Sequence, residues 1–120
     1  MENKTDWTNT LPMAITRTDK DLHIIYMNSM SIKVNNPNGN LNLIGSDLMA
    51  CHNERSRGII RRIIETGEPN VYTITKHGRK KLIYQAPYYD EAGEFAGISE
   101  FSMFLPDDMP HYDRDAEKKH

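Results

Sequence analysis

The amino-acid sequence predicts an α+β domain, and three features of its hydrophobic pattern support this class. Two short apolar runs flank a polar turn near the N-terminus, one central stretch has helical periodicity, and three β-rich runs follow it. The chain has 120 residues, of which 38% are hydrophobic, which is enough for one compact domain with a single core. We therefore expect two strands, short helices, one longer helix and then three antiparallel strands.

The N-terminal part of the chain is predicted to form a β-hairpin. The apolar runs Met13–Thr16 and Leu22–Met27 are separated by Thr18–Asp21, whose oxygen-bearing side chains favour a turn because they can bond their own backbone. A short helix is expected within Asn28–Val34, followed by an exposed loop at Asn35–Asn40.

Two helical segments are expected in the middle of the chain. Residues 46–50 are predicted to form a second short helix with Ser46 as its N-cap. The longer helix begins after Asn53, a good N-cap residue, and ends at Gly67, which suits a helix C-terminus. Its amphipathic character comes from one apolar stripe, made of Ile59, Ile60, Ile63 and Ile64.

The remainder of the chain reads as sheet. Val71–Thr75 and Lys81–Tyr89 are rich in β-branched and aromatic residues, and a turn at Lys76–Arg79 joins them. A second tight turn at Asp90–Gly93 leads into a last strand at Phe95–Phe104.

Charge and composition argue against several classes of function. The formal net charge is -2 and the pI is about 6.2, whereas nucleic-acid binding usually requires a basic excess. We expect no nucleic acid and no membrane as partner, and a cytoplasmic location, since no run is long and apolar enough for a membrane span and one cysteine cannot form an intrachain disulfide. A phosphate-facing patch could be formed by Arg55, Arg57, Arg61 and Arg62 with the separate Arg79–Lys81, but charges on one helix usually form its solvated face.

The order of elements resembles a PAS domain, which is a five-stranded antiparallel sheet with helices covering one face to form a cavity. The resemblance spans residues 11–105 and rests on "DKDLHIIYMN", "LIGSDL" and "DEAGEFAGISEF". It divides the chain into an N-terminal extension (1–10), the PAS domain (11–105) and a polar C-terminal tail (106–120). The Cys-His pair before the long helix is similar to the PAS type that accompanies hemerythrin-like domains.

The resemblance implies a sensory module. PAS domains often end the last strand with Asp-Ile-Thr, whereas this chain has Phe104-Leu105-Pro106 and then a polar tail. No kinase, DNA-binding or cyclase segment follows, so we expect output through a separate signalling partner.

Cys51 and His52 are the first candidate ligand-binding residues. If the long helix extended one turn back, His52 would lie seven residues before Ile59 and share its apolar stripe, facing the cavity, while Cys51 would point away. A neutral imidazole there could hydrogen-bond a polar ligand or act as axial ligand to haem. Alternatively, His52 caps local backbone carbonyls or is a partly buried core residue.

Cys51 admits several interpretations. A cysteine at a helix N-terminus beside Arg55 could be redox-sensitive. "ACHNERS" lacks the Asn-Cys-Arg-Phe-Leu-Gln stretch of flavin-binding relatives, so a flavin is not expected, and neither is a covalent chromophore. An inert buried thiol is the simplest alternative.

Three further residues complete the candidate ligand-binding set. Glu100 lies in the last strand, where a half-buried acid needs a partner or a ligand, and Gln85 and Tyr84 on the neighbouring strand could supply one. The alternative places Glu100 on the exposed sheet face. Asn28 enters the set because PAS domains typically carry an asparagine after the second strand.

These observations lead to a functional hypothesis with two alternatives. We expect a non-enzymatic PAS module that binds a small ligand in an internal cavity, forms a homodimer through its sheet, and signals through protein contacts. The ligand stays unidentified, with haem open, and the scattered histidines and single cysteine give no metal-site spacing. The alternatives are a ligand-free interaction and dimerisation module, and a small α+β enzyme of isomerase-like shape.

Overall fold

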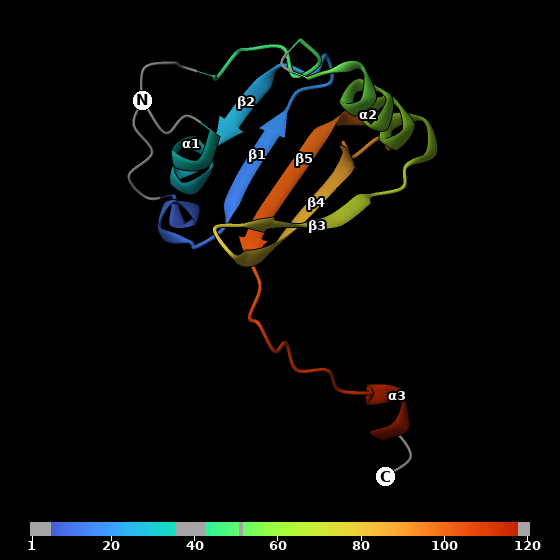
Figure 1. Cartoon of the computed structure of the whole chain (residues 1–120). Coiled ribbons are helices and arrows are strands. Elements are labelled where there is room, and N and C mark those ends of the chain that lie inside the picture. The colour runs from blue at the N-terminus through green and yellow to red at the C-terminus, as the bar shows by residue number, and fades with distance from the viewer. Residues whose placement is uncertain (1–5, 36–42, 51, 118–120) are drawn as a thin grey trace.

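The computed structural model describes residues 6–35, 43–50 and 52–117, and it confirms the α+β class. Five strands and two principal helices make up the domain, with a short helix near each end (Figure 1). In chain order the elements are η1 (Trp7–Thr10), β1 (Ala14–Thr18), β2 (Ile24–Met27), α1 (Ser29–Asn35), α2 (Glu54–Thr66), β3 (Asn70–Lys76), β4 (Arg79–Tyr89), β5 (Phe95–Phe104) and α3 (Arg114–Glu117).

The strands form one antiparallel sheet in the order β2-β1-β5-β4-β3. The first and last thirds of the chain therefore meet in the middle of the sheet, where Ala14 on β1 pairs with Ser102 on β5. The β3–β4 hairpin turns at His77 and Gly78, whose φ angles of 54° and 74° suit the twist of a two-residue hairpin. The predicted hairpins and their turns are thus confirmed.

The register assigns each strand residue to one of two faces. Cross-strand partners share a face, so Glu100, its partner Gln85 on β4 and its partner Thr16 on β1 point to the same side. We call this side, which α1 and α2 flank, the inner face (Figure 1). The opposite side, the outer face, carries Tyr84 and Phe101.

Helix α2 packs on the inner face as its apolar stripe predicts. Ile60 and Ile63 are buried against Ile98 of β5 and form the centre of the core. Asn53 caps the helix by accepting a 2.9 Å hydrogen bond from the Ser56 amide, and Gly67 ends it in the left-handed conformation at φ 73°. Both predicted ends of this helix are confirmed.

The segment before α2 differs from the prediction. Residues 48–50 form a turn rather than a short helix, and Asp47 makes an isolated β-bridge with His23. Ser46 does not act as an N-cap, because its hydroxyl donates backwards to the Leu43 carbonyl at 2.6 Å. Asp47 instead stabilises the turn by accepting the Met49 amide at 2.9 Å. The predicted loop at Asn35–Asn40 lies outside the described residues from position 36 on.

Candidate functional site

The inner face of the sheet carries a cavity of about 400 Å³, which we call the Glu100 cavity. Strands β1, β2 and β5 form its floor, the end of α1 and the segment before α2 form its walls, and its volume is within the range of small-molecule sites. Its lining is half apolar and half polar, and consists of Thr16, Ile24, Met27, Asn35, Leu43, Leu48, His52 and Glu100.

Glu100 is the acidic residue of this cavity. Its Oε2 accepts a 3.3 Å hydrogen bond from the Gln85 amide, and Gln85 is held in turn by a 2.9 Å hydrogen bond from Asn70. Among the described residues, Oε1 of Glu100 makes no hydrogen bond. Burial raises the pKa of Glu100, and the Gln85 hydrogen bond and the charges of His52 and Lys81 offset only part of this effect. The prediction of a partner on β4 is therefore confirmed for Gln85, and the alternative of an exposed acid is wrong.

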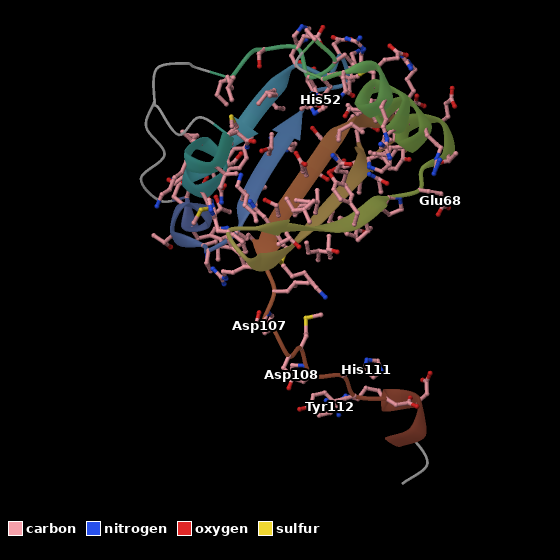
Figure 2. The ribbon with its side chains drawn as sticks, viewed as in Figure 1. His52, Glu68, Asp107, Asp108, His111 and Tyr112 are labelled. Carbon is pink, nitrogen blue, oxygen red and sulfur yellow. The ribbon has the colours of Figure 1, made fainter. Side chains whose placement is uncertain are left out.

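His52 lies on the wall of the same cavity, at the entry to α2 (Figure 2). Helix α2 begins at Glu54, so His52 precedes it and the helical-phase argument for its direction is wrong. The direction comes from a local contact instead, because Nδ1 lies 2.7 Å from the Leu48 carbonyl. Since a carbonyl only accepts, the proton of the neutral ring lies on Nδ1, and Nε2 is then the acceptor.

Of the other candidate residues, neither Tyr84 nor Asn28 lines the Glu100 cavity. Tyr84 lies on the outer face and is 37% exposed, where its ring contacts Phe101 edge-on, so it neither lines the Glu100 cavity nor partners Glu100. Asn28 is fully buried, and its side chain is engaged entirely with backbone groups, as described in the Discussion. Cys51 lies outside the described residues.

One polar group beside the cavity was not predicted from the sequence. Thr16 of β1 hydrogen-bonds Ser31 of α1 through their hydroxyls, and the Asn35 amide donates to the Ser31 carbonyl at 3.0 Å. These short polar residues resemble any turn or helix surface in the sequence. Only the strand phase of Thr16, which alternates with Ile15 and Arg17, could have indicated its inward direction.

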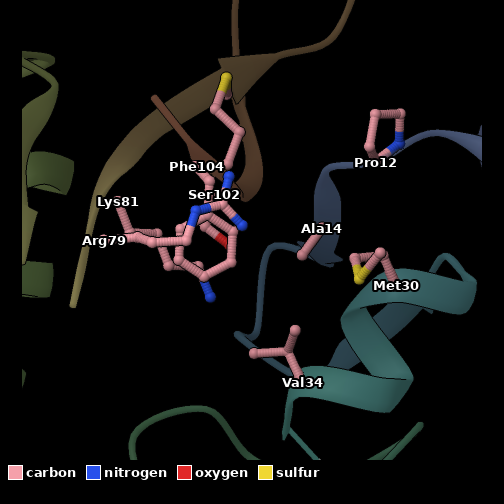
Figure 3. Close-up of a pocket in the computed structure, with 9 residues that line it drawn as sticks. Pro12, Ala14, Met30, Val34, Arg79, Lys81, Ser102 and Phe104 are labelled. Atoms are coloured by element: carbon pink, nitrogen blue, oxygen red, sulfur yellow. The ribbon is translucent and has the colours of Figure 1, made fainter. Parts of the chain in front are cut away.

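A second hollow lies at the other end of the inner face and encloses about 380 Å³; we call it the Phe104 pocket (Figure 3). It shares no lining residue with the Glu100 cavity, and a smaller hollow of about 170 Å³ between them contacts both Lys81 and Glu100. The pocket is lined by Pro12, Ala14, Met30, Val34, Arg79, Lys81, Ser102, Met103 and Phe104.

No group of three or more histidine, cysteine, aspartate or glutamate side chains within the described residues could hold a metal ion. Within the same part of the chain, no helix is long and apolar enough to cross a membrane.

Comparison with known proteins places this geometry in a structural class. No family model matches the sequence, and no curated protein matches it. Solved structures do match: the PAS domain of the histidine kinase ThkA has a TM-score of 0.60 and 19% identity, with 78% of this chain and 99% of that chain covered. A C-terminal domain from Streptococcus mutans gives a TM-score of 0.64 and 21% identity over 80% of this chain and 78% of that chain.

A third match comes from a receptor described as a haem sensor. The Aer2 receptor from Vibrio cholerae, a dual PAS-haem oxygen sensor, has a TM-score of 0.57 and 18% identity over 78% of this chain and 95% of that chain. At these identities the likeness concerns the fold. The chain therefore has the PAS fold, as the sequence predicts, while an association with hemerythrin-like domains stays a prediction.

Proposed function

We propose that this protein is a sensory PAS module that binds a small polar ligand in the Glu100 cavity and signals through protein contacts. One observation carries the proposal: a half-buried carboxylate and an imidazole from distant parts of the chain line one cavity of about 400 Å³. Glu100 Oε1 and His52 Nε2 are both acceptors without a hydrogen bond to a described residue. The cavity thus favours a ligand with hydrogen-bond donors, such as hydroxyl, amide or amine groups.

The test is identification and binding of such a ligand. Native mass spectrometry of the purified protein should show a small molecule that is lost on denaturation, and a thermal-shift screen of hydroxylated heterocycles, amides and amines should give stabilising compounds. Glu100→Gln and His52→Ala should each weaken binding at least tenfold. Glu68→Gln is the matched control, because Glu68 is exposed and lies beyond the C-terminal end of α2 (Figure 2). Absence of any bound or stabilising compound would contradict the proposal.

Haem is a second candidate ligand, favoured by the His52 contact. An axial histidine usually donates its other ring nitrogen to an oxygen acceptor, and the 2.7 Å contact between Nδ1 and Leu48 supplies that arrangement. His52 would then hold the iron through Nε2, and haem would supply a site for a diatomic gas. Hemin titration tests this: a Soret shift in the wild type that His52→Ala abolishes supports haem, and no shift in the wild type rejects it.

We further propose that signalling uses the outer face in a homodimer. Apolar side chains gather there without cover, including Val71 at 50% exposure and Tyr84 at 37%. Ile15, Leu82 and Phe101 lie on the same face by register. Burying such a patch against a second copy would remove it from water.

Sedimentation tests the dimer. The wild type at micromolar concentration should sediment as twice the 13.9 kDa protomer. Val71→Glu should shift it to the monomer, whereas Lys33→Glu, on the exposed side of α1, should not. If the wild type is a monomer at this concentration, the dimer proposal is wrong, and the ligand proposal is unaffected. We propose no catalysed reaction for this protein. We propose instead that it acts in the cytoplasm and passes its signal to a separate protein partner.

A further inference from the structure

The Phe104 pocket combines an apolar body with a cationic end. Ala14, Met30 and Val34 form one wall, contributed by β1 and α1 (Figure 3). Arg79 and Lys81 of β4 lie at the opposite wall around the Phe104 ring. The described lining contains no acidic residue.

Lys81 is the unusual member of this lining, because it is only 5% exposed. Lysine is rarely buried without a partner, since the ammonium loses hydration that only an acceptor or an anion replaces. The Lys81 ammonium lies 5.3 Å from the centre of the Phe104 ring, and it makes no ion pair or hydrogen bond with a described residue. Burial, together with the charge of Lys76, lowers the pKa of Lys81, and the charge of Glu100 offsets only part of this effect.

Arg79 adds a second cation on the same ring. Its guanidinium carbon stacks 4.1 Å from the Phe104 centroid, which fixes its plane while its N–H donors stay available. No described residue forms an ion pair with Arg79. The Ser102 hydroxyl lines the same pocket, so two cations and one hydroxyl converge beside an apolar wall.

We propose that the Phe104 pocket is a binding site for a small amphipathic carboxylate. The carboxylate would lie between Arg79, Lys81 and Ser102, and its hydrocarbon part against Ala14, Met30 and Val34. A carboxylate fits better than a phosphate, because most of the lining is apolar and phosphate sites usually add several backbone N–H donors to the cations. This site shares no lining residue with the Glu100 cavity, so the inference goes beyond the proposed function.

Nuclear magnetic resonance titration tests the inference with defined probes. Hexanoate and benzoate should give saturable shifts in the backbone amides of Ala14, Val34 and Ser102, while hexanamide and benzamide should bind at least tenfold more weakly. Inorganic phosphate tests the class of anion. Saturable shifts from neither carboxylate, equal binding of the amides, or tighter binding of phosphate would each overturn the proposal.

Variants assign the binding to the two cations. Lys81→Met keeps the length and apolar stem of the side chain and removes a poorly solvated charge, so we expect it to fold and to weaken hexanoate binding at least tenfold. Arg79→Gln, at an exposed position, should also weaken binding and serves if Lys81→Met misfolds.

The matched control is Lys80→Met, which removes the same charge from the neighbouring position on the outer face. It should leave hexanoate binding unchanged, and an equal loss in this variant would overturn the assignment. His52→Ala should also leave hexanoate binding unchanged, which separates failure of this inference from failure of the proposed function.

Discussion

Gln85 donates a 3.3 Å hydrogen bond to the carboxylate of Glu100 across β4 and β5. This bond stabilises the charged form, but burial acts more strongly in the opposite direction and raises the pKa of Glu100 above its ordinary value of 4.5. The pair thus holds a carboxylate in a cavity at a cost in stability, as ligand sites often do.

The first prediction concerns this cost. Between pH 4.5 and the raised native pKa, the folded protein keeps a proton on Glu100 that the unfolded chain releases, so stability falls as the pH rises through this window. Glu100→Gln lacks this loss and can still accept the Gln85 hydrogen bond. Its melting temperature should exceed that of the wild type at pH 7, and the difference should shrink toward pH 4. Scanning calorimetry across this range measures it; a constant difference would contradict the titration argument.

The second prediction concerns Asn28, whose side chain joins three elements. Its Oδ1 accepts the amides of Ile15 and Ser31 at 2.9 and 3.0 Å, and its Nδ2 donates to the carbonyls of Thr8 and Met13 at 2.8 and 3.0 Å. Asn28→Ala leaves these buried groups unpaired, so it should cost about 3 kcal/mol or more. Urea denaturation followed by circular dichroism provides the measurement. Ser29→Ala, at the neighbouring exposed position, should stay within about 0.5 kcal/mol of the wild type.

The third prediction concerns the contact between β1 and β5 at Gly97. A Cβ at this position would lie 2.2 Å from the Thr18 carbonyl oxygen and 2.8 Å from the Tyr88 ring. The same carbonyl accepts the Tyr88 hydroxyl at 2.6 Å, so neither neighbour can move without breaking a bond. Gly97→Ala should destabilise the fold by about 3 kcal/mol or more, because the clash involves backbone. Gly58→Ala, which meets nothing within 4 Å on α2, should instead be neutral or stabilising.

The fourth prediction concerns the start of α2. Asn53→Ala removes the 2.9 Å bond to the Ser56 amide and should cost about 1 kcal/mol. Because His52 directly precedes this cap, the variant should also broaden or shift the His52 ring signals in nuclear magnetic resonance spectra. Unchanged ring signals would show that the Leu48 contact alone orients the imidazole.

The sequence predicted the elements better than it predicted the site. Strand alternation and the isoleucine stripe depend on local periodicity, so β1–β5 and α2 could be recognised with their turns and caps. The direction of His52 depends on a carbonyl four residues earlier in an irregular segment, which no periodic rule describes. The register with Thr16 and Gln85 places Glu100 on the inner face. Alternation in the sequence alone does not tell which face of the strand is covered by the helices.

The Phe104 pocket is a second site that sequence periodicity alone does not predict. Arg79–Lys81 reads as a charged hairpin end, and Lys80 is exposed on the outer face, as a charged residue at such an end usually is. Lys81 departs from this pattern because its inner-face position and the neighbouring Phe104 bury its stem and its ammonium together. The alternation of side chains along a charged strand predicts which of them are buried only when it is known which face of the sheet the helices cover.

The C-terminal segment begins at the hairpin that carries these cations. The Leu105 amide donates a 2.9 Å hydrogen bond to the Lys80 carbonyl, and from there the chain runs away from the sheet toward α3, past Asp107 and His111 (Figures 1 and 2). Because this hydrogen bond joins the departing chain to the strand that carries Arg79 and Lys81, a shift of that strand would also move the start of the C-terminal segment.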